Sequence, residues 1–181
     1  RVKFVVNPVG DTNQFNYYDP LLGRLSSNVT DGVVMRYLYN AVGNVTNTVY
    51  PDGSRAAILY DGTRVISSTD RHGLTASFGY DLAGRQVAVT NSNGSVTLYV
   101  YDAVGNRLSV TASTESGITN TTSYAFDSMN RGTVVTRPDS LSSTNAWDLL
   151  GRLASKTGAG SVPAFYAYDA AGKMTNLVDG V

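Results

Sequence analysis

Cysteine is absent from this chain of 181 residues, and two other chemically useful residues occur once each, as Glu115 and His72. Without cysteine the chain can form neither a disulfide nor a thiolate metal site. A metal centre built from several histidines is likewise excluded. No apolar run approaches the length of a membrane span, and no signal peptide is evident. Because the chain begins with Arg1 rather than Met, we expect it to be a piece of a longer protein.

Charged residues are also scarce, at 15% of the chain, and Lys+Arg 14 balances Asp+Glu 14. A chain without net charge has no general attraction for nucleic acid or for an anionic membrane, so neither is predicted as a partner. Glu and Lys, which favour helices, are rare, whereas Tyr, Thr and Val, which favour strands, are plentiful. The hydrophobic content of 42% predicts one ordinary domain with a hydrophobic core.

The dominant pattern is an aromatic residue followed by Asp, or once by Asn, which occurs eight times with steps of 21, 21, 20, 21, 25, 21 and 21 residues. A fixed period of this kind indicates a repeat architecture. We call each copy a Tyr-Asp pair. The pairs are Tyr18-Asp19, Tyr39-Asn40, Tyr60-Asp61, Tyr80-Asp81, Tyr101-Asp102, Phe126-Asp127, Trp147-Asp148 and Tyr168-Asp169. An acidic residue that recurs in every repeat favours an architectural role over a catalytic one.

The segment from Tyr80 to Tyr101 shows the content of one repeat most clearly. Residues 80–85 are typical of a turn, and residues 86–90 alternate like a strand. Residues 91–94 predict a second turn, because Asn-Gly is the strongest short hairpin signal. Residues 95–101 alternate again and lead into the next Tyr-Asp pair. Each repeat is therefore predicted to hold two short strands and two turns.

The second turn also recurs in phase, with a glycine that supplies the positive φ of a tight hairpin turn. Its copies are Asp31-Gly32, Asp52-Gly53, His72-Gly73, Asn93-Gly94, Ser116-Gly117 and Asp179-Gly180, with Asp139-Ser140 and Gly160-Ser161 as weaker ones. Such short connections suit only antiparallel neighbours. The predicted fold is all-β: a continuous antiparallel β-hairpin meander of about 16 short strands, with residues 1–181 forming a single array of eight repeats. An open sheet rarely exceeds ~10 strands without curling, so we expect a spiral or shell-like sheet.

Some copies depart from the pattern. The turn at Tyr18 has one residue more than the others, and the turn from Tyr60 to Arg64 has one fewer. Residues 129–132 lose the usual Gly-Arg order. The 25-residue step predicts a longer hairpin tip between Thr111 and Thr122.

Residues 80–85, 101–108 and 168–174 resemble the YD repeat of Rhs proteins, and the eight phased copies extend the resemblance over essentially the whole chain. The resemblance implies a spiralling β-sheet that closes into a hollow shell, as in bacterial polymorphic toxins, insecticidal toxin complexes and teneurins. In the bacterial members the shell encloses a C-terminal toxin, which an aspartate autoprotease in a core motif releases. This sequence contains neither that motif nor a toxin domain, so the resemblance implies the wall of a container rather than its cargo.

The candidate site residues are those of the recurring motif, with a structural role. Successive rings are expected to stack, and Asp is expected to accept backbone N–H groups in the turn, with the Arg of the same motif nearby. The set is Tyr18, Asp19, Tyr39, Tyr60, Asp61, Tyr80, Asp81, Gly84, Arg85, Tyr101, Asp102, Gly105, Phe126, Asp127, Trp147, Asp148, Gly151, Arg152, Tyr168, Asp169 and Gly172. A sugar-binding strip of rings is the functional alternative. A glycosidase pair of carboxylates is disfavoured because the repeat already explains most Asp residues.

The sequence thus predicts a non-enzymatic segment of a secreted or cell-surface bacterial protein, without a cofactor or metal. Its expected role is to form part of a shell that encapsulates a toxin or another polypeptide. The alternative is an extracellular filament or adhesin module that assembles through exposed strand edges and binds glycans. Expected partners are further repeats of the same chain or copies of itself, the enclosed toxin, and, for the adhesin, glycans.

Overall fold

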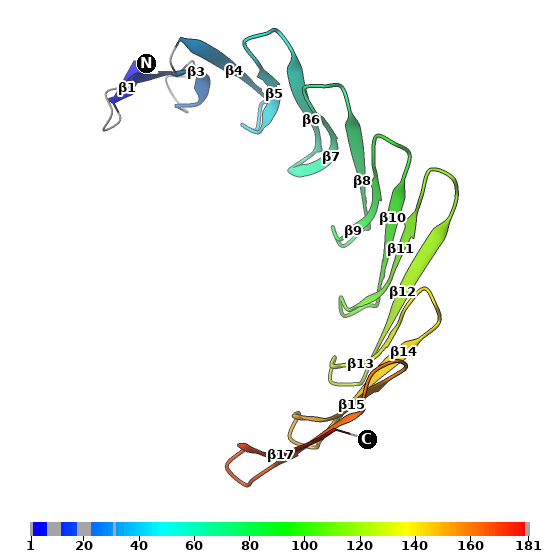
Figure 1. Ribbon diagram of the computed structural model, residues 1–181. Helices are drawn as coiled ribbons and strands as arrows, with labels where there is room; N and C mark the ends of the chain where they lie inside the picture. Colours follow the sequence, from blue (N-terminus) through cyan, green and yellow to red (C-terminus); the bar gives the residue numbers. More distant parts are fainter. Residues whose placement is uncertain (1, 7–11, 18–22, 31, 180–181) are drawn as a thin grey trace. The chain divides into compact units, whose positions relative to one another are not determined.

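The computed structural model describes the backbone of residues 2–6, 12–17, 23–30 and 32–179, and the side chains of residues 23–30 and 32–177. Seventeen strands and no helix are found in these described ranges (Figure 1). All of the strands belong to one antiparallel sheet. The prediction of an all-β hairpin meander is therefore confirmed, while its curling into a spiral stays a prediction.

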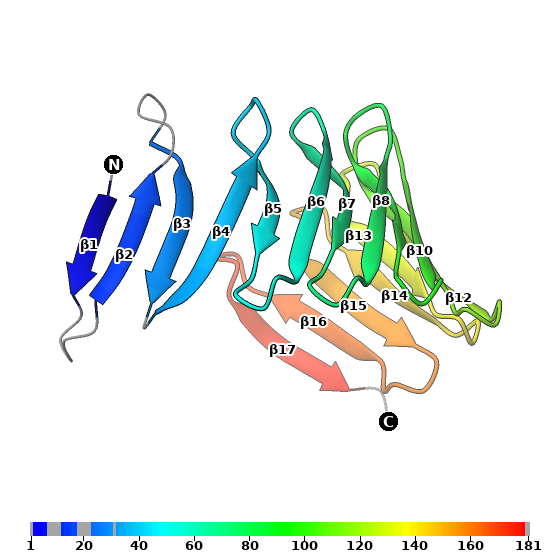
Figure 2. The ribbon, with the colours of Figure 1, turned by 90° about the horizontal axis from the view of Figure 1, so that it is seen from above.

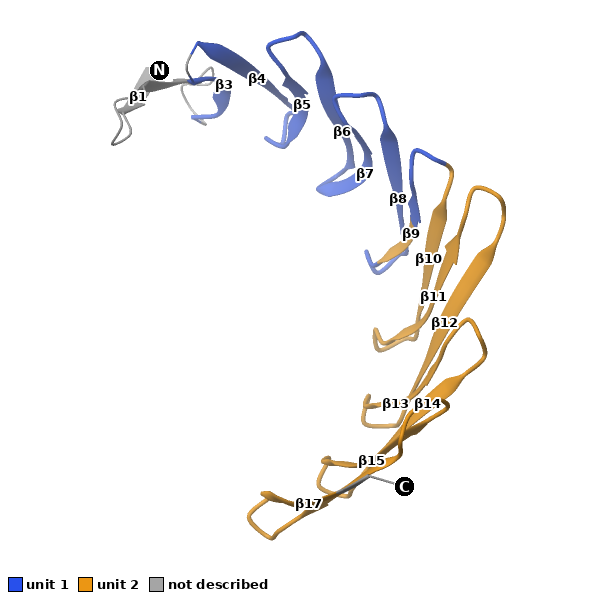
Figure 3. Cartoon of the chain, viewed as in Figure 1, with its two compact units in different colours: residues 1–85, 89–93 blue, residues 86–88, 94–181 orange. Residues whose placement is uncertain are grey.

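Contacts divide the chain into two compact units, residues 1–85 with 89–93 and residues 86–88 with 94–181 (Figure 3). The strands of the first unit are β1 (Val2–Val6), β2 (Thr12–Tyr17), β3 (Leu25–Thr30), β4 (Val33–Tyr39), β5 (Val45–Val49), β6 (Arg55–Asp61), β7 (Arg64–Thr69) and β8 (Thr75–Tyr80). β9 (Gln86–Thr90) contributes residues to both units. The second unit holds β10 (Val96–Tyr101), β11 (Arg107–Ser113), β12 (Thr119–Phe126), β13 (Gly132–Thr136), β14 (Ser142–Trp147), β15 (Leu153–Gly158), β16 (Ala164–Tyr168) and β17 (Met174–Asp179).

Within each unit, consecutive strands pair with one another and the turns alternate between two edges of the sheet (Figure 2). The turns lie at the two ends of the strands. We call the row of strand ends that carries the turns of the Tyr-Asp pairs the Tyr-Asp edge, and the row at the other strand ends the opposite edge. β-branched and aromatic side chains fill the strands, as a pleated and half-exposed surface favours. The connections are short, so each repeat lies beside the repeats that precede and follow it in the sequence.

A β-bulge accompanies the aromatic residue of the Tyr-Asp pairs. In β10 and β11, Val100 pairs with Ser109 while Tyr101 pairs with Arg107, which leaves Leu108 without an opposing residue. The same shift occurs next to the aromatic residue in β4, β6, β12, β14 and β16. Bulges increase local twist and re-aim side chains. No feature of the sequence had indicated them.

Several pairs of strands that are joined at the opposite edge stay paired over a shorter stretch. β7 and β8 pair from Thr69↔Thr75 to Ser67↔Ser77, and β15 and β16 pair only at Ser155↔Phe165 and Lys156↔Ala164. Towards the Tyr-Asp edge these described strands have no further register pairs, so their backbone groups need other partners there.

The described side chains contain no buried residue, apolar or polar. The prediction of a hydrophobic core is therefore wrong for these residues. The physical reason is that, in the described ranges, the strands of each unit contact only their sequence neighbours, so no second layer of described residues covers either face of the sheet. Stability must come from contacts between adjacent repeats. Among the described residues, no helix has the length and apolar character needed to cross a membrane.

Candidate functional site

The turn of the Tyr-Asp pair is a five-residue hairpin connection. In the turn 148–152 the N–H of Asp148 donates to the carbonyl of Arg152 (2.9 Å), and the N–H of Gly151 donates back to the carbonyl of Asp148 (3.0 Å). Gly151 has a φ of 81°, which a side chain disfavours. A type I turn followed by one left-handed residue has this geometry. The turns that begin at Asn40, Asp81, Asp102, Asp127 and Asp169 have the same two hydrogen bonds.

Four turns at the opposite edge have the same geometry. The N–H of Asp70 donates to the carbonyl of Leu74 (2.9 Å), and the N–H of Gly73 donates to the carbonyl of Asp70 (3.1 Å). The turns 50–54, 114–118 and 137–141 repeat this arrangement. The sequence predicted a second hairpin turn in each repeat from its Asn-Gly, Asp-Gly and similar pairs, and these four turns confirm it. The glycine is the fourth residue of a longer turn, where it takes the left-handed position.

Two turns place another residue at the left-handed position. Asn130 has a φ of 60° and Ser140 a φ of 64°. Asn130 thus occupies the glycine position and Arg131 the arginine position, so the Gly-Arg order that seemed lost at residues 129–132 is preserved in structure. The 25-residue step also has a different cause from the one expected. The turn 114–118 has the usual length, and the extra residues lengthen β11 and β12.

The carboxylate of the Asp accepts hydrogen bonds from other residues of its own turn. Oδ1 of Asp148 accepts the N–H groups of Leu150 (2.9 Å) and Arg152 (2.8 Å), and Oδ2 accepts Nε–H of Arg152 (2.7 Å). Asp81 with Arg85 and Asp127 with Arg131 form the same ion pair. The hydrogen bond from the Arg152 amide is the main cause that lowers the pKa of Asp148; partial desolvation opposes it, and the hydrogen bond from the guanidinium adds to the lowering.

Two repeats replace the arginine by asparagine. Nδ2 of Asn106 donates to Oδ2 of Asp102 (2.8 Å) and to Oδ1 of Asn130 in the following turn (2.9 Å). In the turn 40–44 both positions are Asn. Oδ1 of Asn40 accepts the N–H groups of Gly43 and Asn44 (2.9 Å each), but Nδ2 of Asn44 is buried without a hydrogen-bond partner.

The arginine also reaches the next repeat. Nη1 of Arg131 donates to the carbonyl of Asp148 (3.4 Å), and its guanidinium lies 5.5 Å from the ring centroid of Trp147. Arg152 bonds the carbonyl of Asp169 (3.4 Å) and lies 4.4 Å from the ring centroid of Tyr168. Arg24 makes the equivalent contacts with the carbonyl of Asn40 and the ring of Tyr39 in the first unit. A guanidinium within about 6 Å of a ring is attracted to its π face.

The aromatic residue of a Tyr-Asp pair also donates a hydrogen bond to the preceding repeat. The hydroxyl of Tyr168 donates to the carbonyl of Leu153 (2.9 Å), and Leu153 is the residue that pairs with Trp147 of the preceding repeat. Tyr39, Tyr60, Tyr80 and Trp147 donate in the same way to carbonyls 14 or 15 residues earlier. These bonds lie where the strands joined at the opposite edge are no longer paired. The aromatic side chain therefore substitutes for missing backbone hydrogen bonds.

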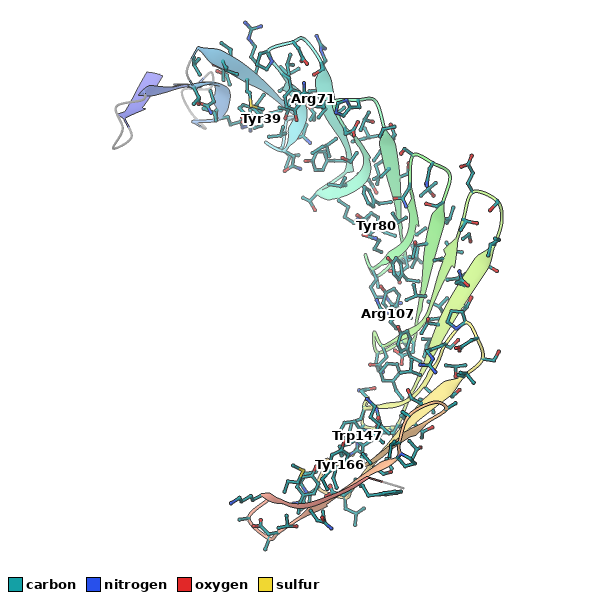
Figure 4. The ribbon with its side chains drawn as sticks, in the orientation of Figure 1. Tyr39, Arg71, Tyr80, Arg107, Trp147 and Tyr166 are labelled. Atoms are coloured by element: carbon teal, nitrogen blue, oxygen red, sulfur yellow. The ribbon has the colours of Figure 1, made fainter. Side chains whose placement is uncertain are left out.

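Together these contacts form what we call the inter-repeat clamp: the Asp of one turn, the Arg that it holds, and the aromatic ring and carbonyl of the next repeat. In the second unit, Figure 4 shows Arg107, Trp147 and Tyr166 on the same side of the sheet. The guanidinium of Arg107 lies 5.4 Å from the ring centroid of Tyr124. Arg107 is not part of the clamp, but it covers a ring in the same way. The sequence suggested stacked rings, whereas these ring contacts are made by guanidinium groups.

The structure places most of the motif residues that were predicted from the sequence. Tyr18 and Asp19 lie outside the described residues. Tyr39, Tyr80, Tyr101, Phe126, Trp147 and Tyr168 end their strands, and Gly84, Gly105, Gly151 and Gly172 have positive φ. Tyr60 and Asp61 differ, because a shorter turn follows them and Arg64 contacts Asp61 across 3.4 Å at an exposed position.

Sequence reasoning missed part of the clamp. Arg24, Arg64, Arg131 and Asn106 occupy the position of Arg85 and Arg152, and the 21-residue period could have found them. The carbonyl groups that accept the aromatic side chains, such as that of Leu153, could not be predicted from the sequence, because every residue has a backbone carbonyl. In the described part of the chain, no three His, Cys, Asp or Glu side chains gather closely enough to hold a metal ion.

Comparison with known proteins agrees with this architecture. A family model described as RHS Repeat matches residues 60–96 and 80–119. No curated protein matches the chain. Among solved structures, the chain is similar to the Photorhabdus luminescens Tc holotoxin pore with a mutated TccC3, at a TM-score of 0.69 and 12% identity over 97% of this chain and 10% of that one. It is also similar to the crystal structure of TcdB2-TccC3-TEV, at a TM-score of 0.66 and 13% identity over 97% of this chain and 11% of that one.

At these identities the structural similarity concerns the fold alone, and the chain spans about a tenth of the length of those structures. The family match concerns the sequence itself and covers the repeats around Tyr60, Tyr80 and Tyr101. The resemblance drawn from the Tyr-Asp pairs is thereby confirmed for residues 60–119, which match the RHS Repeat family model.

Proposed function

We propose that this chain is a structural, non-enzymatic segment of the wall of a β-sheet shell that encloses a toxin or another polypeptide. The observation that carries the proposal is the inter-repeat clamp. Through Arg24, Arg131 and Arg152 it ties a turn to the next one with charge-assisted hydrogen bonds, and so gives a sheet one layer thick lateral continuity without a hydrophobic core. The fold shared with the Tc toxin structures supports the same role.

The state of the carboxylates argues for architecture over catalysis. A general acid needs a raised pKa near the working pH, whereas hydrogen bonds from Arg131 hold the pKa of Asp127 below its ordinary value, and Asp148 behaves alike. Both carboxylates already accept backbone N–H groups and a guanidinium. The rings of the clamp are likewise engaged by guanidinium groups, which leaves less ring surface for a sugar than a glycan-binding strip requires.

The test uses the longest natural polypeptide that contains this segment. We expect any polypeptide that it encloses to resist trypsin in the native protein. Arg152→Ala and Arg131→Ala together should raise its cleavage rate, because they loosen two successive clamps. A matched control is Arg55→Ala, which changes an exposed arginine on β6 away from these clamps. Cleavage that is fast in the native protein and unchanged by the clamp variant would contradict the proposal.

The filament alternative is distinguished by electron microscopy and size-exclusion chromatography of the 181-residue chain. Long fibres built by strand pairing would favour the filament over the shell. Discrete particles, or a chain that is stable only with flanking repeats, would favour the shell. A secreted or cell-surface bacterial location belongs to both proposals and follows from the family and from the Tc toxin similarity.

A further inference from the structure

The turn 91–95, which joins β9 to β10 at the opposite edge, contains a chemically labile pair of residues. Asn93 is the only asparagine of the chain that is followed by glycine. Both Asn93 and Gly94 are exposed to solvent. The backbone nitrogen that follows an asparagine can attack the carbon of the side-chain amide, and a glycine nitrogen is the least hindered because glycine has no Cβ. Asn93 is therefore the asparagine whose amide the main chain reaches most easily.

The turn 91–95 has the same left-handed position as the other turns of this edge. Gly94 has a φ of 79°, close to the 83° of Gly53. Asn93, which precedes Gly94, therefore occupies the third position of the turn, as Asp52 does in its own turn. The contacts of the aspartates at this position show which way its side chain is directed.

An acidic side chain at the third position folds back onto the turn. Oδ1 of Asp52 accepts the N–H of Ser54 (3.0 Å), and Oδ1 of Asp139 likewise accepts the N–H two residues further on (3.0 Å). A side chain with this bond lies over the amide between the two residues. For Asn93 that amide belongs to Gly94. The turn thus favours an arrangement in which the two reacting atoms are close, which accelerates an intramolecular reaction.

We propose that Asn93 is a site of spontaneous deamidation in the folded chain. The nitrogen of Gly94 bonds to Cγ of Asn93, and the bond from Cγ to the side-chain nitrogen breaks. That nitrogen takes up the proton of the Gly94 amide and leaves as ammonia, and a succinimide ring remains. One molecule of solvent water then opens the ring. Opening at one carbonyl yields aspartate, and opening at the other yields isoaspartate. The reaction needs no oxidant or cofactor.

The two products differ in how they fit the turn 91–95. Aspartate suits the third position, since Asp52 already occupies it in another turn. Isoaspartate does not, because the side-chain methylene has become part of the main chain and alters the connection between β9 and β10. Either product adds a carboxylate, so Lys+Arg 14 then faces fifteen acidic groups and the formal net charge falls from 0 to −1. The modification is independent of the proposed shell function.

Other candidates lack one of these conditions. Nδ2 of Asn106 donates two hydrogen bonds, at 2.8 and 2.9 Å, and arginine follows it in the sequence. Asp52 is followed by glycine, but hydrogen bonds from the hydroxyl and the amide of Ser54 lower the pKa of Asp52. Asp52 is consequently ionised at neutral pH, and a carboxylate resists attack by a nucleophile. Asn93 should therefore be modified first.

The test is ageing of the folded 181-residue chain at neutral pH, followed by trypsin digestion and mass spectrometry. Trypsin releases the peptide of residues 86–107, which contains Asn91, Asn93 and Asn106 and so carries its own controls. Compared with a sample digested before ageing, the peptide should gain the mass of an amide-to-acid conversion at Asn93 alone. It should elute as separate aspartate and isoaspartate forms. Isoelectric focusing of the intact chain should show a new band that is more acidic by one charge.

The matched control is Asn93→Gln, which keeps an exposed amide but places its carbon one bond farther from the nitrogen of Gly94. The control should keep its amide over the same period and have the circular dichroism spectrum of the wild type, because the replaced side chain is exposed. The proposal is overturned if Asn93 stays intact in the native chain while it converts in urea. Equal conversion at Asn91 and Asn93, or conversion of the control at the wild-type rate, overturns it as well. Because protease protection tests the shell function separately, either proposal can fail alone.

Discussion

Replacement of Asn40 by Asp should stabilise the first unit. In the turn 40–44, Oδ1 of Asn40 already accepts two backbone N–H groups, and the remaining side-chain atom of Asn40 is an amide nitrogen. Nδ2 of Asn44, a donor, is buried and has no partner. The equivalent Asp102 uses its second oxygen to accept Nδ2 of Asn106 at 2.8 Å. Asn40→Asp supplies that missing acceptor without a change in side-chain size.

The magnitude follows from the buried donor. An unsatisfied buried polar group costs about 1–3 kcal/mol, and a hydrogen bond to a charged group contributes about 1.5–3 kcal/mol. Arg24, whose Nη1 lies 3.2 Å from the carbonyl of Asn40, adds a favourable charge nearby. The carboxylate retains some exposure to water, which screens the gain. We therefore expect the free energy of unfolding to rise by about 1–2 kcal/mol at pH 7.

Urea denaturation of the wild type and the variant measures this change, and amide hydrogen exchange at Gly43 and Asn44 shows whether it is local. The reciprocal variant, Asp102→Asn, recreates the Asn40–Asn44 arrangement in the second unit and should destabilise it. A midpoint that does not move, or falls, for Asn40→Asp would refute the reasoning, as would an Asp102→Asn variant as stable as the wild type.

Three further outcomes are expected. Ser140→Gly should stabilise the chain by about 0.5–1 kcal/mol in urea denaturation, because Ser140 has a φ of 64°; Asn130→Gly should change little, since Asn tolerates that conformation, and equal effects at both positions would contradict the argument. Tyr168→Phe should cost about 1 kcal/mol by removing the donor to the Leu153 carbonyl, and a neutral result would show that the hydroxyl bond is not needed. The pKa of Asp148 is lower in the folded state than its ordinary 3.8, so its carboxylate stabilises the fold fully above that value and the contribution disappears as the pH falls further. The urea midpoint of Asp148→Asn should accordingly depend less on pH below about 4 than that of the wild type, and identical pH profiles would argue against the clamp.

The repeat determined much of the fold without any structure. The 21-residue period located the aromatic residues of the described Tyr-Asp pairs at the ends of their strands, apart from Tyr60, which is followed by Asp61 in β6. Residues 86–90 were predicted with the bounds of β9. Local patterns sufficed because strand alternation and turn glycines are properties of short segments. At residues 129–132 the local pattern indicated that the Gly-Arg order was lost. In the structure Asn130 takes the left-handed position that glycine holds elsewhere.

Long-range contacts could not be derived in this way. The bond from Tyr168 to the carbonyl of Leu153 joins residues 15 apart, and it exists because β15 and β16 are paired over only a short stretch. The guanidinium of Arg152 over the next ring depends on the Asp148 carboxylate, which fixes its direction. A repeat pattern shows which residues recur, but not which atoms of neighbouring repeats meet.

The sequence by itself determined the repeat, the strand class and the resemblance to the RHS Repeat family, because all three are encoded in residue order within some twenty positions. The tertiary structure decided how a sheet without buried residues is held together. That property depends on the register between strands, which bulges at the Tyr-Asp pairs set. Register brings Asp, Arg and the next aromatic ring into one clamp.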